Sequence, residues 1–247
     1  MTNLRRMVLA LAAALVTGGM AGAAGEAEEQ GPPLPDLIAK GLRRWETIKT
    51  FRATFIRRER LEGKTQLGEK QVIFLRERRD PFSIYMHWLE GPGKDRKVAY
   101  VEGRNNGKFK VTPGGLLGWM VLDMALDDPR VYQNSRHMVT EAGMGPLLRR
   151  VDQQVKLSGA DVITKYKGKA AFNNRPCYKF VRYMPQKPEY YCWKTEMLVD
   201  EELSFPLYLR LYDWQRNVFE EYSYADLEVD PDYTDRHFDI QAEKEPN

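Results

Sequence analysis

Residues 82–88 of this 247-residue chain read Phe-Ser-Ile-Tyr-Met-His-Trp, with a large apolar side chain at every second position. In a β-strand these four apolar side chains would share one face, because successive residues point to opposite sides of a sheet. They are Phe82, Ile84, Met86 and Trp88. The run therefore predicts a strand whose apolar wall faces either the protein's own core or an apolar ligand.

The periodicity on either side of this run predicts the surrounding elements. Apolar residues recur every three or four positions from residue 34 to about 48, which predicts an amphipathic helix. Period-two alternation and turn signals such as Gly91-Pro92-Gly93 follow, which are typical of an antiparallel meander. The expected strands of this meander are 51–56, 72–75, 82–88, 98–101 and 108–111.

The middle of the chain, residues 113–168, is irregular and predicts short helical pieces. It is rich in methionine, a flexible and polarizable side chain that lines surfaces which adapt to a ligand. A helix packed on the sheet as ordinary core would explain the same residues. We treat Trp119, Met120 and Met124 as a candidate lid, and Phe74 as a candidate wall residue together with the four apolar residues of 82–88.

The two cysteines flank a predicted hairpin formed by residues 177–183 and 191–199. With a turn over residues 184–189, this hairpin would place Cys177 opposite Cys192. An even number of cysteines in an exported protein favours a disulfide between them. The alternative is that both remain buried, reduced thiols.

The first 24 residues have the pattern of a secretory signal peptide. Arg5 and Arg6 precede an unbroken apolar run, and small residues follow through Ala24. We expect a flexible leader at 25–33, a single domain at 34–240 and a frayed tail at 241–247. Removal of Arg5 and Arg6 lowers the formal net charge from +3 to +1, which implies neither a nucleic acid partner nor an anionic membrane. We expect an exported, periplasmic or extracytoplasmic protein without a transmembrane span after signal removal.

The sequence contains no recognisable catalytic constellation. His87, His137 and His237 are far apart, and no phosphate-binding glycine loop or nucleophile elbow is present. We therefore expect neither catalysis nor a metal or other cofactor. A structure that brings His137 or His87 beside an acid in a cleft would favour an envelope hydrolase instead.

The order of elements and two long segments carry a resemblance to a known family. The segments are RRDPFSIYMHW with the following GPGKDRKVAYVEGRNNGKFKVTP, and FPLYLRLYDWQRNVFEEYSYADLEVDPDYTDRHFDI. Over residues 34–240 the chain resembles the LolA-like superfamily of periplasmic lipoprotein carriers. More closely, it resembles a branch of bacterial exported proteins defined as a domain of unknown function.

This resemblance implies an α+β fold with a curved antiparallel sheet that forms an incomplete β-barrel. An N-terminal helix and the helical middle segment would cover the concave face. In the carriers an arginine before the proline of the aromatic strand helps to close a lid. Here Asp80 directly precedes Pro81, so Arg79 is the candidate for a lid or head-group contact.

Three functions remain open from the sequence. The first is a non-catalytic exported module whose cavity binds a lipid, a lipoprotein acyl chain or another amphiphile, with a lipidated protein among its partners. The second is a structural or regulatory envelope protein whose side chains fill the same core and which binds another envelope protein. The third is the hydrolase. A cavity of about 300 Å³ or more would separate the first from the second.

Overall fold

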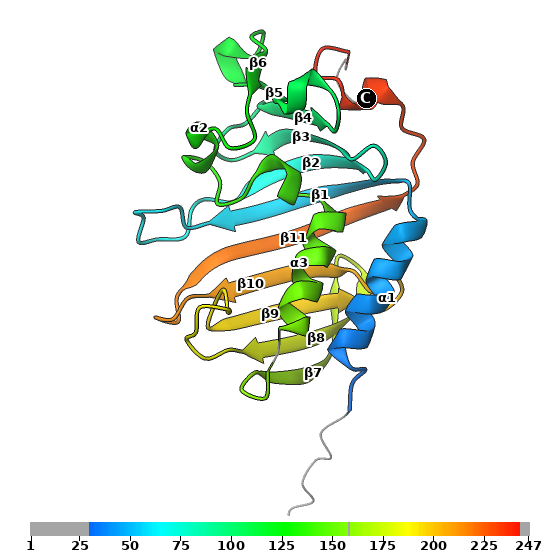
Figure 1. Cartoon of the computed structure of the whole chain (residues 1–247), viewed down its shortest axis with the longest axis vertical. Coiled ribbons are helices and arrows are strands. Elements are labelled where there is room, and N and C mark those ends of the chain that lie inside the picture. The colour runs from blue at the N-terminus through cyan, green and yellow to red at the C-terminus, as the bar shows by residue number, and fades with distance from the viewer. Residues whose placement is uncertain (1–29, 158, 243–247) are drawn as a thin grey trace, which may run out of the picture.

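The computed structural model describes residues 30–157 and 159–242, which form a curved, open antiparallel sheet with helices on one face (Figure 1). The α+β half-barrel expected from the sequence is confirmed. The expected signal peptide lies outside the described residues, as do most of the expected leader and tail. None of the helices in the described ranges is long and apolar enough to cross a membrane.

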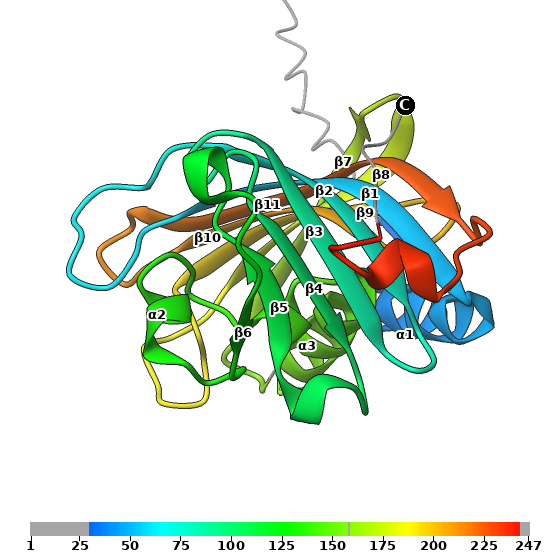
Figure 2. The same ribbon diagram turned by 90° about the horizontal axis from the view of Figure 1, so that it is seen from above.

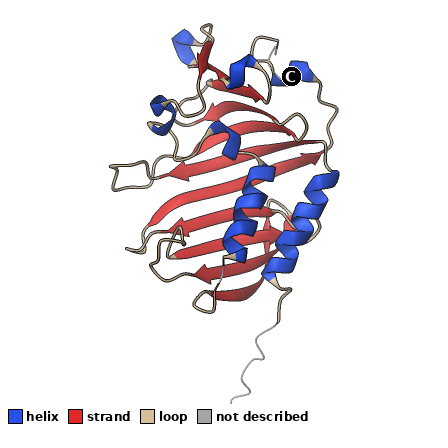
Figure 3. Cartoon of the chain, in the orientation of Figure 1, coloured by secondary structure: helices blue, strands red, loops and turns tan. Residues whose placement is uncertain are grey.

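The elements are drawn by type in Figure 3. The helices are α1 (Leu34–Thr47), α2 (Pro129–Tyr132) and α3 (Met144–Lys156). The strands are β1 (Thr50–Glu59), β2 (Gln71–Arg78), β3 (Ser83–Glu90), β4 (Lys97–Val101), β5 (Phe109–Thr112), β6 (Leu122–Met124), β7 (Ile163–Phe172), β8 (Arg175–Tyr183), β9 (Lys194–Asp200), β10 (Pro206–Tyr212) and β11 (Val218–Val229). Short 3₁₀ turns lie at Asn105–Gly107, Gly115–Leu117, Val139–Glu141 and Asp235–Phe238.

The sheet consists of two meanders joined at its centre. Its order is β6-β5-β4-β3-β2-β1-β11-β10-β9-β8-β7, so the first and last strands of the chain are neighbours. In their register Phe55 lies opposite Tyr224, and Glu59 lies opposite Glu220. This junction makes one continuous concave face out of segments that are far apart in the sequence.

Helix α1 forms where the sequence predicted it. Pro35 suits its first turn, and its buried side includes Leu34, Ile38 and Trp45. Figure 2 shows α1 and α3 on the same side of the sheet, where they pack against each other. Trp45 also meets the edges of Phe51 and Phe205, which fills the concave face beneath α1 with aromatic side chains.

A buried carboxyl group on β2 fixes the start of α3. The backbone N–H groups of Met144 and Gly145 donate to Glu77 at 2.6 and 3.2 Å, which satisfies two of the donors that a helix N-terminus leaves free. A glycine at position 145 lets the helix start pack this closely, because a Cβ there would lie 2.5 Å from the indole nitrogen of Trp45 and 3.0 Å from the carboxyl group of Glu77. Burial raises the pKa of Glu77 to about 8, although the two N–H groups act in the opposite direction. Glu77 thus ties α3 to the sheet.

The convex face carries a second, smaller apolar cluster. Tyr85 and Ala99 pack there against Phe238 and Ile240 of the C-terminal segment. The chain after β11 therefore folds back over β3 and β4.

The hairpin register differs from the prediction, and with it the disulfide. Cys177 lies opposite Asp200, because the hairpin turns through the long connection 184–193 and not within 184–189. Cys192 consequently lies in that connection, outside both strands. Both cysteines are free and buried, so the predicted bridge is not formed.

Strand β7, like the short β6, was not predicted, because residues 113–168 were expected to be irregular or helical. Strand β7 is an edge strand whose Lys165, Lys167 and Lys169 are exposed, so its sequence lacks the apolar alternation that marks a half-buried strand. Its pairing with β8 shifts between Tyr166 and Lys169, around Gly168 with φ 80°.

The role of Glu77 can be tested by comparing Glu77→Ala with Glu77→Gln. The alanine variant leaves two buried N–H groups without an acceptor, and we expect its free energy of unfolding to fall by on the order of 3 kcal/mol. Glutamine retains an acceptor oxygen, so its loss should be clearly smaller. Urea denaturation at neutral pH measures both values, and equal losses would contradict this account of the helix start.

Candidate ligand cavity

A cavity of about 570 Å³ lies between the concave face of the sheet and the elements that cover it. Its walls are mostly apolar, and its roof is formed by α2, α3 and the segment between them. Wall residues come from both meanders, including Phe55, Val98, Phe109, Met197, Leu209 and Leu211. Because β1 and β11 are neighbours, this one cavity spans both halves of the sheet.

The four alternating apolar residues of 82–88 lie in different places. Met86 and Trp88 line the cavity, together with Met124 of β6. Ile84 is fully buried in the main core. Phe82 is only partly buried and packs against Tyr100, with ring centroids 6.2 Å apart. Of the four alternating residues, only Met86 and Trp88 thus line the cavity.

Other residues singled out from the sequence lie away from the cavity. Phe74 faces the convex side, where it packs against the second cluster, because the side chains of β2 that point inward are those of Ile73 and Leu75. Trp119 is 79% exposed in the loop before β6, and the partly buried Met120 follows it. These two residues therefore do not lie where a lid would, and Val131, Val139 and Leu147 supply roof contacts instead.

Arg79 is exposed and lies in the turn between β2 and β3, beside the connection from α1 to β1. Its Nε donates to the carbonyl oxygen of Ile48 at 2.9 Å, and its backbone N–H donates to that of Lys49 at 2.9 Å. These bonds hold the β2–β3 turn against the start of β1. Arg79 therefore holds this turn in place.

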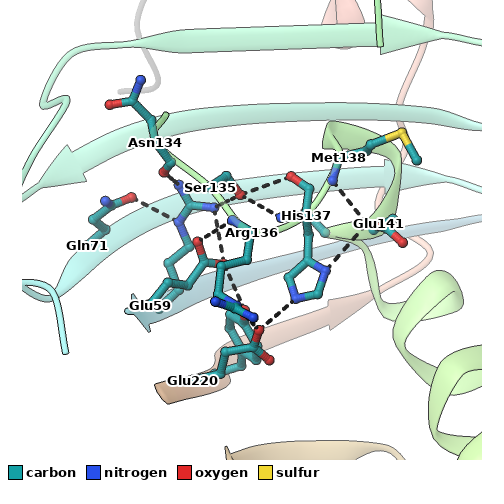
Figure 4. A network of polar contacts seen from close by, with 12 residues as sticks. Glu59, Gln71, Asn134, Ser135, Arg136, His137, Met138, Glu141 and Glu220 are labelled. Carbon is teal, nitrogen blue, oxygen red and sulfur yellow. Dashed lines mark hydrogen bonds and ion pairs between the residues drawn. The ribbon is translucent and has the colours of Figure 1, made fainter. Parts of the chain in front are cut away.

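Two buried carboxylates face each other in the floor of the cavity. Glu59 of β1 and Glu220 of β11 are register partners and are 8% and 1% exposed. Like charges directly opposite each other destabilise a sheet unless cations or donors compensate them. Figure 4 shows that the compensation comes from the segment 134–142, which we call the strap.

Arg136 of the strap bridges both carboxylates. Its backbone N–H donates to Glu59 at 3.0 Å, and its Nε donates to Glu220 at 2.7 Å. The hydroxyl of Tyr222 donates to Glu59 at 2.7 Å, and that of Tyr191 donates to Glu220. The strap is thereby fixed across the centre of the concave face.

His137 adds a second ionic contact between the strap and the sheet. Its ring nitrogens lie 3.2 Å from Glu220 and 3.4 Å from Glu141, and Arg150 of α3 pairs with Glu141 at 2.7 Å. Burial disfavours the charged ring, but the bonds to Glu141 and Glu220 outweigh it and raise the pKa of His137 to about 9. The raised pKa favours the charged ring at neutral pH, and a charged ring does not serve as a general base.

Arg57 holds the first residues of the strap. Its guanidinium donates to the hydroxyl of Ser135 at 2.8 Å, to the carbonyl of Asn134 at 3.2 Å and to Gln71 at 2.9 Å. The Ser135 hydroxyl in turn donates to the carbonyl oxygen of His137, so it is not directed at the imidazole ring. The arrangement is suited to holding the strap in place.

Arg96 also lines the cavity, but it takes no part in the hydrogen bonds and ion pairs that hold the strap. It lines the cavity with its guanidinium 5.5 Å from the Trp88 ring, and Arg57 lies on the same ring at 5.7 Å. Burial, and then the charge of Arg57, lower the pKa of Arg96. Within the described ranges no acidic side chain forms an ion pair with it. The same part of the chain has no group of three or more acidic, His or Cys residues that could hold a metal ion.

The sequence named His137 only as a residue that would favour a hydrolase beside an acid, and it did not point to the other members of this polar centre. Glu59, Arg136, His137 and Glu220 are separated by up to 161 residues along the chain, counted from Glu59 to Glu220, and share no spacing. The only local signal was a charged residue inside a strand pattern, which also describes an ordinary solvated face.

We predict that the strap loosens as the pH rises. The pKa of His137 is raised in the fold from 6.5 to about 9, so its stabilisation is complete below about 6.5 and is lost as the pH rises through about 9. The groups facing it are Glu141, Glu220 and Arg150. Between pH 6 and pH 9.5 the free energy of unfolding should fall by on the order of 2 kcal/mol more in the wild type than in His137→Gln. Parallel urea curves for the two proteins would argue against this role.

Comparisons with solved structures give similarities of fold at low sequence identity. The lipoprotein LppX of Mycobacterium tuberculosis is 10% identical with a TM-score of 0.48, and the match covers 83% of this chain and 99% of that one. A LolA superfamily protein from Nitrosomonas europaea is 7% identical with a TM-score of 0.39, covering 85% and 98%. The structure of the Pseudomonas aeruginosa MucA/MucB complex is 13% identical with a TM-score of 0.48, covering 83% of this chain and 60% of that one.

The comparison with curated proteins gives no match. A family model does match, over residues 48–245, from the end of α1 to beyond the last described residue. It is described as DUF1571, a protein of unknown function. Because this family model matches four fifths of its length, the chain belongs to the DUF1571 family.

Proposed function

We propose that this protein is an exported, non-catalytic binding module that takes up one long-chain amphiphile. The observation that carries the proposal is the cavity of about 570 Å³ along the concave face. Its volume falls within the range of about 300–1,000 Å³ that is typical of small-molecule sites. A core filled by its own side chains would leave no such space, so the volume supports the binding module over the structural alternative.

The apolar walls can supply most of the binding free energy. An acyl chain of a dozen methylenes would contribute about 10 kcal/mol on burial, at roughly 0.8 kcal/mol per methylene. Several wall residues are methionines, among them Met86, Met124, Met184 and Met197, and methionine adapts to ligands of differing shape. We therefore expect tolerance of chain length and unsaturation.

Arg96 supports an anionic head group. It lies in the cavity beside Trp88, and its charge is disfavoured there by burial and by Arg57. A carboxylate or phosphate at this position would relieve both effects and accept charge-assisted hydrogen bonds. The amphiphile would then lie with its chain along the sheet and its head group near β4.

The hydrolase remains the second candidate, because His137 lies beside Glu220 and Glu141 in the cavity. This is the arrangement that would favour catalysis. The raised pKa of His137 and the occupied hydroxyl of Ser135 support a holding role for this pair instead.

The head-group proposal predicts a selective effect of Arg96→Gln. We expect palmitate to bind about tenfold more weakly, because a charge-assisted hydrogen bond is lost, while methyl palmitate binds as it does to the wild type. Displacement of a fluorescent fatty acid measures both affinities. Arg79→Gln is the matched control, since Arg79 is exposed and bonds to Ile48. A greater effect of Arg79→Gln would return the head-group role to the residue suggested by the sequence.

The cavity itself is tested by filling it. Val98→Trp should weaken palmitate binding by at least about tenfold, because the indole takes up space that the chain needs. Val101→Trp lies on the same strand but packs toward the convex cluster, and it should bind like the wild type. Native mass spectrometry of the purified protein should show a bound amphiphile that is absent from Val98→Trp. Equal binding by both variants would contradict the proposed site.

A further inference from the structure

The loop between β5 and β6 exposes large apolar side chains to solvent. Leu116 is 97% exposed, Leu117 is 51% exposed and Trp119 is 79% exposed. The ten residues 113–122 contain no charged side chain. We call residues 113–121 the apolar loop. A single exposed leucine is ordinary on a protein surface, but three such side chains within four residues mark an interaction site.

The base of the apolar loop is held firmly while its tip projects. Gly114 has φ 83° and packs so closely on the backbone of the β3–β4 turn that a Cβ would lie 2.6 Å from the carbonyl oxygen of Lys94. The Gly115–Leu117 turn follows, and the chain then enters β6, which is an edge of the sheet (Figure 1). The exposed side chains therefore sit at one end of the half-barrel.

The two ends of the apolar loop border the cavity, although its tip lies away from it. Pro113 at its start lines the cavity, and so do Leu122 and Met124 directly after it. The acyl chain of an amphiphile that leaves the cavity past β5 and β6 would thus meet the apolar loop. This continuity distinguishes the loop from the other exposed apolar residues, such as Ile163 on the opposite edge strand β7.

The chemistry of the loop fits the interfacial region of a lipid bilayer. Leucine side chains at a projecting tip can enter the acyl region, and tryptophan prefers the level of the head groups. The charged side chains beside the loop are of both signs, and the exposed Asp95 lies in the β3–β4 turn against which Gly114 packs. Lys94 and Lys108 are exposed, and the carboxylate of Asp123 is bonded to Asn105 and Lys110 at 2.8 and 3.2 Å.

We propose that the apolar loop inserts into a bilayer surface and so turns the rim of the cavity toward the membrane. An amphiphile would then pass between bilayer and cavity without crossing open water. The insertion stands on the loop alone, whereas this passage rests on the proposed function of the cavity. Insertion is driven by apolar burial, which agrees with the nearly balanced net charge of the chain.

Sedimentation with vesicles of phosphatidylcholine and a minority of phosphatidylglycerol tests the insertion. The double variant Leu116→Ser/Trp119→Ser should bind these vesicles at least about tenfold more weakly than the wild type, because two apolar side chains no longer leave water. Ile163→Ser is the matched control at the other edge and should bind like the wild type. All of these proteins share the same N-terminal segment, so any contribution from it is common to them.

Brominated phosphatidylcholine in the vesicles adds a local readout. Bromine should quench part of the tryptophan fluorescence of the wild type, and this part should be lost in Trp119→Phe, which retains an apolar tip. Sedimentation of the serine double variant equal to that of the wild type would overturn the proposal. Quenching that is unchanged in Trp119→Phe would do the same.

The two proposals fail separately. If the serine double variant binds palmitate in solution like the wild type but no longer binds vesicles, the insertion is supported and the cavity is intact. If the wild type binds vesicles through the loop but binds no palmitate, the insertion holds and the proposed function fails. If the wild type binds palmitate but no vesicles, the insertion is overturned.

Discussion

The organisation of this protein depends on two carboxylates that face each other across the junction of its first and last strands. Glu59 and Glu220 are buried at the centre of the sheet, where neither could remain charged without partners. Arg136 and His137 provide these partners, and both belong to a segment that must cross the concave face to reach them. The pairing of β1 with β11 thus creates an electrostatic requirement, and meeting it holds the strap across the concave face as part of the roof of the cavity.

The open space arises from the way that the two helices are held. Trp45 of α1 packs with Phe51 and Phe205 and fills one part of the concave face. Helix α3 starts at the carboxyl group of Glu77 and is therefore tied to the sheet at that end. The strap is held by ionic contacts to the floor, and its Val139 packs into the main core, so it covers the remaining part of the concave face. Apolar side chains line a space there which they do not fill.

Local patterns in the sequence predicted most of the helices and strands, but they could not predict polar contacts between distant segments. Helix α1 and the first five strands follow from apolar periods that are local to each segment. Strand β7 was missed because its outward face carries lysines, and the disulfide was wrong because the length of the connection 184–193 set the register. Of the expected wall residues, Met86 and Trp88 line the cavity because alternation gives the face of a strand, whereas Met124, expected in a helical lid, lines it from strand β6. Arg96 and the strap could not be identified from such patterns, because their roles depend on partners that lie on distant strands.

The unclosed sheet leaves β7 as a long free edge, and the composition of that edge bears on how the protein behaves when crowded. A free edge offers unpaired backbone groups to any other extended chain. The lysines at 165, 167 and 169 would bring like charges together if two copies met there, and the irregular pairing around Gly168 twists the strand away from a flat template. The charges and the irregular pairing of this edge therefore disfavour pairing between two copies along β7, although the sheet is not closed into a barrel.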